Sequence, residues 1–231
     1  MPSDTVISKR IGALASWARI PAHTNTSDVR LDIHRLLDLT LAGSLLLFVS
    51  PMLVLIALAV KLQDGGPILF KQVRLGRHGR PFVCLKMRTM APNAEAQLEA
   101  LLAVDAEARQ DWASYRKLKN DPRTTRLGRL LRKSSLDELP QFLNVLRGDM
   151  SVVGPRPIVD AEAVNYGRHF RHYCAVRPGI TGLWQINGRN NTNYRRRVAL
   201  DVLYVRSRSV RLDLAILVST VPAVLLRNGS Y

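Results

Sequence analysis

Two adjacent carboxylates, Asp137 and Glu138, follow a long basic run in the chain. Eight Lys or Arg residues and a single acid, Asp121, lie between Arg116 and Lys133. Nearby cations favour the ionised form of a carboxyl group, so both side chains are expected to be charged. Ionised carboxylates in a basic pocket suit a metal-assisted reaction on a phosphate, with the cations holding the substrate. The alternative interpretation is a solvated basic helix followed by a capping pair.

The residues around the dyad allow two local structures. Ser135 and Glu138 have the spacing of a capping box, which would start a helix at the dyad. Pro140 favours a helix that begins at the proline itself, which leaves the dyad in the turn just before it. In both structures the carboxylates lie at a helix N-terminus, where free N–H groups attract anions. Adjacent helical residues point about 100° apart, so different roles are expected for Asp137 and its neighbour.

Length and charge limit the classes of function. The chain has 231 residues, which is enough for one sizeable core, and a net charge of +16. That charge indicates anionic partners: nucleic acid, phosphorylated metabolites or an acidic membrane surface. Cys84 and Cys174 match no metal or redox spacing, which indicates reduced cysteines that face the cytosol.

An apolar run, Leu39–Val60, contains no charged residue over 22 positions. As one straight helix it would span roughly 33 Å, enough to cross a bilayer core. Basic residues flank both ends, and a single crossing would place one basic cluster on the wrong side. Ser50 and Pro51 lie at the centre, where proline kinks a helix. The sequence therefore predicts a re-entrant helix that turns at Ser50 and Pro51, with an ordinary kinked transmembrane helix as the alternative.

The remaining segments predict an α+β fold that is mostly helical, with a small β-hairpin. Two strands are expected over 68–74 and 81–90, joined by a glycine-containing turn. Helices are predicted over three further ranges: 93–120, 123–133 and 158–173. Segment 1–28 is either an interfacial amphipathic helix or a basic tail, and segment 212–227 suits a helix that lies in the membrane interface, with packing in the protein core as the alternative.

Four motifs occur in a recognisable order after the apolar Ser-Pro helix: KMRTM (86–90), the segment 121–157, RPGITGLWQINGRN (177–190) and LDVLYV (200–205). From about Leu31 to the C-terminus the chain resembles the bacterial sugar transferases, which are monotopic phosphoglycosyl transferases. Its C-terminal part is similar to the exopolysaccharide-initiating undecaprenyl-phosphate galactose phosphotransferases. With this resemblance, three parts are expected: a tail over 1–28, a re-entrant membrane helix hairpin over 29–62 and a catalytic domain over 63–231.

The resemblance implies transfer of a sugar-1-phosphate, with galactose or glucose as the sugar, from a UDP-sugar to undecaprenyl phosphate. UMP would be released in this first membrane step of exopolysaccharide biosynthesis. Asp137 matches the nucleophile of the family, which forms a phosphosugar-aspartyl intermediate. Glu138 matches a metal-associated glutamate and would hold Mg²⁺ together with Asp137. The positions implied to bind substrate phosphate are Lys86, Arg132, Arg156 and Arg189.

The same resemblance implies a monotopic protein on the cytosolic face of the bacterial inner membrane, with anionic lipids as further partners. Its interface helices would also allow a homodimer. A nucleic-acid-binding protein would explain the net charge, but it leaves the uncharged run and the dyad unexplained, and no nucleic-acid motif is recognised. No nucleic-acid partner is therefore expected. A non-enzymatic membrane scaffold of polysaccharide assembly is the other alternative, and it leaves the clustered Asp, Glu, Lys and Arg residues without a purpose.

Overall fold

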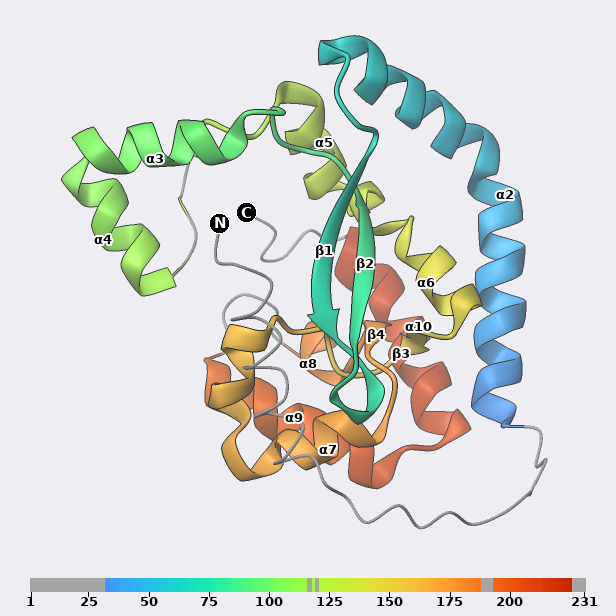
Figure 1. The fold of residues 1–231 in the computed structure, drawn as a ribbon. Coiled ribbons are helices and arrows are strands. Elements are labelled where there is room, and N and C mark those ends of the chain that lie inside the picture. The colour runs from blue at the N-terminus through green and yellow to red at the C-terminus, as the bar shows by residue number, and fades with distance from the viewer. Residues whose placement is uncertain (1–31, 116–117, 119–120, 188–192, 226–231) are drawn as a thin grey trace.

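The computed structural model describes residues 32–115, 118, 121–187 and 193–225, so the predictions for segment 1–28 and for Arg189 lie outside it. The described chain is mostly helical and contains two small two-stranded sheets, which confirms the predicted α+β class (Figure 1). The α-helices are α2 (Ile33–Asp64), α3 (Ala94–Val104), α4 (Ala106–Tyr115), α5 (Arg126–Lys133), α6 (Gln141–Arg147), α7 (Phe170–Ala175), α8 (Leu183–Ile186), α9 (Tyr194–Ser207) and α10 (Val210–Leu225). The 3-10 helices are η1 (Arg77–Gly79), η2 (Leu136–Glu138) and η3 (Asp160–His169). The strands are β1 (Leu69–Leu75), β2 (Pro81–Met87), β3 (Ser151–Val153) and β4 (Gly179–Thr181).

Helix α2 contains the predicted apolar run and has Pro51 in its interior. Figure 1 shows it along one edge of the molecule, with a change of direction partway along its length. Several of its large apolar side chains face away from the protein: Leu47 is 78%, Phe48 84% and Leu62 75% exposed. Within the described residues, α2 is the one helix that is long and apolar enough to cross a membrane. Its re-entrant course stays a prediction.

Polar residues near the start of α2 bond it to the rest of the protein. Arg35 donates from Nη1 to the carbonyl oxygen of Val145, at the end of α6, over 2.6 Å. The buried Asp38 carboxylate accepts hydrogen bonds at 2.8 Å from the Ser151 hydroxyl group and from the backbone N–H group of Val152. These bonds satisfy polar groups that burial would otherwise penalise, and they fix the first half of α2 to β3 and α6.

Strands β1 and β2 form the predicted antiparallel hairpin, with Phe70 opposite Lys86 and Arg74 opposite Phe82. The turn between them contains His78 at φ 60°, a left-handed conformation that residues other than glycine rarely adopt. The second strand was predicted to extend to residue 90, but it ends at Met87. β3 and β4 form a separate parallel pair.

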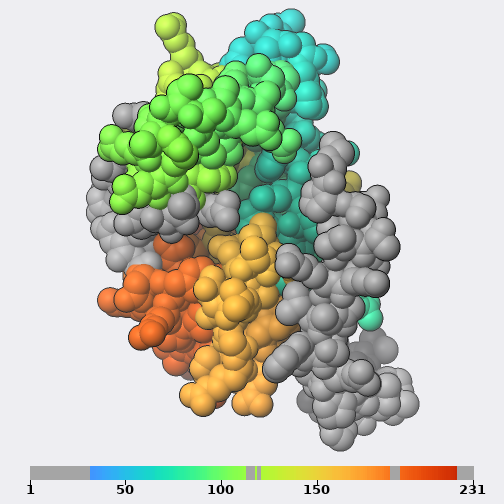
Figure 2. All heavy atoms as spheres, turned by 60° about the vertical axis from the view of Figure 1, so that its left-hand side comes forward, coloured from blue at the N-terminus to red at the C-terminus, as the bar shows by residue number. Residues whose placement is uncertain are grey.

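Two helix predictions are corrected by the structure. The predicted helix over 93–120 is broken into α3 and α4, because the Asp105 side chain accepts a hydrogen bond from the Ala108 N–H group and so starts a new helix. The predicted helix over 158–173 is the 3-10 helix η3 followed directly by α7, and Gly167 inside η3 departs from the helical conformation. Figure 2 shows α3 and α4 projecting over one face of the molecule, above η3 and α7.

Candidate active site

The dyad lies in a turn between two helices, as the position of Pro140 predicted. Asp137 and Glu138 form the 3-10 helix η2, and α6 begins at Gln141 with Pro140 as its N-cap residue. The alternative capping box does not form, since Ser135 has a left-handed backbone (φ 59°) and its side chain makes no capping hydrogen bond.

Helix α5 brings the dyad against the β-hairpin. The Thr125 side chain caps α5 by accepting a hydrogen bond from the Gly128 N–H group at 2.9 Å. A Cβ atom on Gly128 would lie 2.0 Å from the carbonyl oxygen of Thr89, so glycine is needed for this contact. The packing of α5 on the segment after β2 therefore depends on the absence of a side chain at Gly128.

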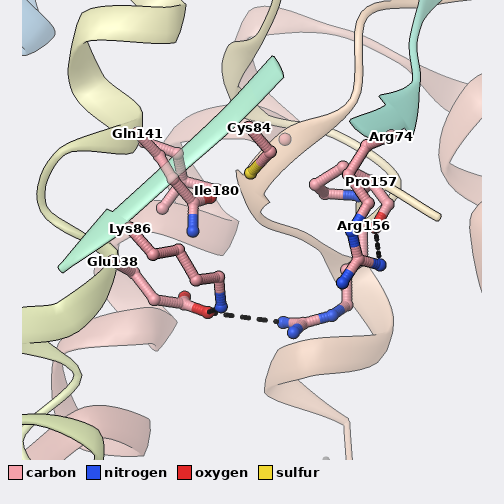
Figure 3. A pocket seen from close by; sticks show the side chains of 9 residues that line it. Arg74, Cys84, Lys86, Glu138, Gln141, Arg156, Pro157 and Ile180 are labelled. Carbon is pink, nitrogen blue, oxygen red and sulfur yellow. Dashed lines mark hydrogen bonds and ion pairs between the residues drawn. The ribbon is translucent and has the colours of Figure 1, made fainter. Parts of the chain in front are cut away.

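Glu138 is paired with cations from two separate segments (Figure 3). Lys86 on β2 donates from Nζ to Oε1 of Glu138 over 2.6 Å. Arg156, in the loop between β3 and η3, has its Nη1 atom 3.7 Å from the same oxygen. Burial raises the pKa of Glu138, but Lys86, Arg156 and Arg74 outweigh it and hold the pKa below the ordinary value. The glutamate is therefore an ionised group inside a cationic pocket.

Asp137 has a different environment, although it is the adjacent residue. It is only 8% exposed. Burial raises its pKa to about 6, against the opposing effects of Lys86 and Arg132, and the charge on Glu138 adds to the rise. The sequence predicted that nearby cations would set the pKa of this carboxyl group and lower it, but desolvation has the larger effect and raises it. A carboxylate with a raised pKa is still mostly ionised at pH 7, and it is a stronger base than an exposed aspartate.

A pocket opens beside Glu138, and Figure 3 shows the side chains that surround it. It is lined by Arg74, Cys84, Lys86, Glu138, Gln141, Arg156, Pro157, Gly179 and Ile180. Arg74 and Gln141 are not among the site residues predicted from the sequence. Arg74 is held in place because its Nη1 atom donates to the Pro157 carbonyl oxygen at 3.0 Å. The hairpin register could have indicated Arg74 as a site residue. Arg74 lies opposite Phe82, which is four residues before Lys86 on β2, and alternate residues of a strand share one face.

The remaining predicted site residues are not all in this pocket. Arg132 donates from Nε to the Thr89 hydroxyl group at 2.9 Å, and its charge lowers the pKa of Asp137. It does not line the pocket around Glu138. Arg189 lies outside the described residues. The structure therefore brings together Lys86, Arg156 and the dyad, with Arg132 as a further cation near Asp137.

The site has few protein ligands for a metal ion. Among the described residues, no group of three or more His, Cys, Asp or Glu side chains is placed to hold a metal. Mg²⁺ often binds through one or two carboxylates, with waters and substrate phosphates completing its coordination. Two adjacent carboxylates fit that pattern, and no other described residue donates a hydrogen bond to the Asp137 side chain.

Comparison with known proteins adds independent information. A family profile described as "Bacterial sugar transferase" matches residues 29–227. The chain is 48% identical, over 85% of its length, to the exopolysaccharide production protein ExoY of Rhizobium meliloti, and the match covers 87% of that protein. It is 46% identical, over 86% of its length, to the undecaprenyl-phosphate galactose phosphotransferase of Salmonella typhimurium, and spans only 42% of it. It is 42% identical, over 85% of its length, to the UDP-glucose:undecaprenyl-phosphate glucose-1-phosphate transferase of Caulobacter vibrioides, with 71% of that protein covered.

Proposed function

Because the chain belongs to the bacterial sugar transferase family, we propose that it transfers a sugar-1-phosphate from a UDP-sugar to undecaprenyl phosphate and releases UMP. The names of the Salmonella and Caulobacter relatives support this reaction with galactose or glucose, and the ExoY name supports a role in exopolysaccharide synthesis. The observation that carries the proposal is the buried Asp137 beside a pocket lined by Lys86, Arg74 and Arg156. A nucleophile next to cations is what transfer of a phosphoryl group between two anionic substrates requires.

In the proposed first step, a carboxylate oxygen of Asp137 attacks the phosphorus atom that bears the sugar. The bond from this phosphorus to the oxygen of UMP breaks, and UMP leaves with the electron pair. In the second step, a phosphate oxygen of undecaprenyl phosphate attacks the same phosphorus, and Asp137 leaves as a free carboxylate. The raised pKa of Asp137 supports this role, because it increases nucleophilicity while leaving the group mostly ionised at pH 7.

The cations would hold the diphosphate and the charge that develops during transfer. Lys86 and Arg156 share one carboxylate oxygen of Glu138 in the present structure, so a diphosphate can replace the glutamate as their partner. Arg132 would act on the other side of Asp137. We include Arg189 in this set on the resemblance alone.

Mg²⁺ is the proposed cofactor, with Glu138 and Asp137 as its protein ligands. Bound there, it would neutralise negative charge on the diphosphate. Glu138 suits this role because its pKa is lowered, so that it stays ionised over the physiological range.

The attachment of α2 supports a monotopic arrangement on the cytosolic face. Arg35 and Asp38 fix the first half of α2 to α6 and β3, whereas Asp64 at its far end pairs with Arg88 after β2. A straight helix of 32 residues spans about 48 Å, more than a bilayer core of about 30 Å. A spanning helix would have its ends on opposite sides, but here both ends are bonded to one domain. We propose that segment 29–62 re-enters at Ser50 and Pro51 and that residues 63–231 form the catalytic domain.

The reaction is tested by UMP release from the full chain in detergent with undecaprenyl phosphate, Mg²⁺ and a panel of UDP-sugars. We expect release with one or two sugars, dependent on the lipid, and none from Asp137→Asn. Radiolabel from the donor sugar should remain on wild-type protein when the lipid is omitted, and the variant should carry none. No release with any donor from folded protein would instead support the membrane scaffold.

The topology is tested with two variants that each add one cysteine, Asp32→Cys and Gln63→Cys, by labelling them with a membrane-impermeant maleimide. Both positions are exposed, whereas the native Cys84 and Cys174 are buried and should give little background. We expect both variants to react in inverted vesicles and neither in right-side-out vesicles. Reaction from opposite sides would establish a transmembrane helix. Pairing of the interface helices in a homodimer stays a prediction.

A further inference from the structure

Three helices with exposed apolar side chains have their ends at one place in the fold. The start of α2 is bonded to the start of α10, since Nδ1 of His34 lies 2.6 Å from a carboxylate oxygen of Asp213. It is also bonded to the end of α6 through Arg35. Exposed apolar residues occur on α6 (Leu146, 37%) and on α10 (Val218, 72%), as they do on α2. If the apolar faces enter the membrane, this junction of helix ends lies at the depth of the lipid headgroups.

Arginines from three separate loops gather at this junction. Arg77 is in the turn of the β-hairpin, Arg177 follows α7 and Arg208 lies between α9 and α10. Arg177 donates from Nε to the carbonyl oxygen of Gly148, just after α6, at 2.9 Å. Partial desolvation and then the charges of Arg177 and Arg208 lower the pKa of Arg77, so both of these arginines act on Arg77. Figure 1 shows the hairpin turn and the first residues of α2 at the same end of the molecule.

These three arginines lack a full complement of counter-charges. None of them forms a salt bridge with a carboxylate in the described part of the chain. The Arg208 side chain is hydrogen-bonded to the Tyr204 hydroxyl group, but its buried Nε atom has no hydrogen-bond partner among the described residues. Asp32 and Asp38 are near the cluster, but the Asp38 carboxylate is already bonded to β3. Like charges held together repel one another, so an anion at this position would stabilise the protein.

We propose that Arg77, Arg177 and Arg208 form a binding site for the phosphate group of an anionic phospholipid headgroup. Guanidinium groups donate paired hydrogen bonds that match the geometry of a phosphate. A lipid is favoured over a soluble anion because the site adjoins the ends of three apolar helices. The site is separate from the proposed donor pocket, whose lining cations are Lys86, Arg74 and Arg156. The proposal depends on membrane association of the chain and not on the transferase reaction.

The site is tested by titrating the full chain, in an uncharged detergent, with dihexanoyl phosphatidylglycerol or dihexanoyl phosphatidylcholine and measuring the melting temperature. We expect phosphatidylglycerol alone to raise the melting temperature in a saturable way. The first variant is Arg77→Gln, because this side chain is exposed and makes no hydrogen bond that fixes the fold, so the change should not lower the lipid-free melting temperature. It should bind the anionic lipid about fivefold more weakly, and the triple variant that adds Arg177→Gln and Arg208→Gln should lose the saturable effect.

The matched control removes the same number of charges from exposed positions elsewhere, as Arg109→Gln, Arg171→Gln and Arg195→Gln. This control should bind the lipid like the wild type. An equal loss in the control would show only general attraction by the net charge and would overturn the proposal. Equal stabilisation by inorganic phosphate would indicate a site for a soluble anion, and equal stabilisation by phosphatidylcholine would indicate no charge recognition. Either result would also contradict the lipid site.

Discussion

Replacing the proposed nucleophile should make the protein more stable while it abolishes activity. Asp137 is buried, and its pKa is raised from 3.8 to about 6. A carboxyl group with a raised pKa in the folded state favours folding when protonated. Its stabilising contribution is complete below pH 3.8 and is lost as the pH rises through about 6. Above that pH the folded protein bears the cost of a desolvated charge, which the uncharged amide of Asp137→Asn does not have.

The size of this effect follows from the two pKa values. Their difference of about two pH units, at about 1.4 kcal/mol each, corresponds to about 3 kcal/mol of unfolding free energy. For a domain of this size, that corresponds to a rise in melting temperature of about 5–10 °C. The variant should therefore melt higher than the wild type at pH 8 and at the same temperature as the wild type near pH 4.

The assay is thermal unfolding of both proteins in detergent over a series of pH values, with UMP release measured in parallel. Glu138→Gln is the matched control. Cations hold the pKa of Glu138 low, so the expected change in melting temperature has the opposite sign. Its ionised form stabilises the folded state at neutral pH, so removing the charge should lower the melting temperature there. A melting temperature for Asp137→Asn that is equal to or below the wild-type value at pH 8 would refute the argument that desolvation dominates this carboxyl group.

Three further predictions concern the groups that surround the dyad. Lys86→Gln should raise the pKa of Asp137 further, because Lys86 lowers it now, so the acidic limb of the pH–rate profile should move to higher pH. Arg88→Gln should lower the unfolding free energy by about 3 kcal/mol, seen as a lower melting temperature, since the largely buried Arg88 bonds both carboxylate oxygens of Asp64. Gly128→Ala should lower both stability and activity, because the new Cβ atom would meet a backbone oxygen at 2.0 Å and displace α5 from the hairpin; an unchanged melting temperature would contradict this packing.

Local signals in the sequence were sufficient for the elements that carry the site. The hairpin followed from two β-rich runs around a glycine-containing turn, and the turn at the dyad followed from Pro140. The prediction of one long helix over 93–120 was wrong, because the apolar periodicity does not show that the Asp105 side chain caps a second helix. Arg74 and Gln141 were missed because their position in the pocket depends on strand register and on how α6 packs, and neither is a local property.

The opposite pKa directions of two adjacent carboxyl groups are the clearest case of what local sequence could not reveal. Both residues follow the same basic run, so the sequence predicted ionisation by cations for both. In a 3-10 turn, successive side chains point about 120° apart, so only one of them can face the interior. Asp137 faces the interior, and burial raises its pKa. Glu138 faces the pocket, and the charges of Lys86 and Arg156 lower its pKa. Gly128 lets α5, the helix just before η2, pack against the backbone of Thr89 just after β2, so a residue with no side chain helps to place both carboxyl groups beside the hairpin.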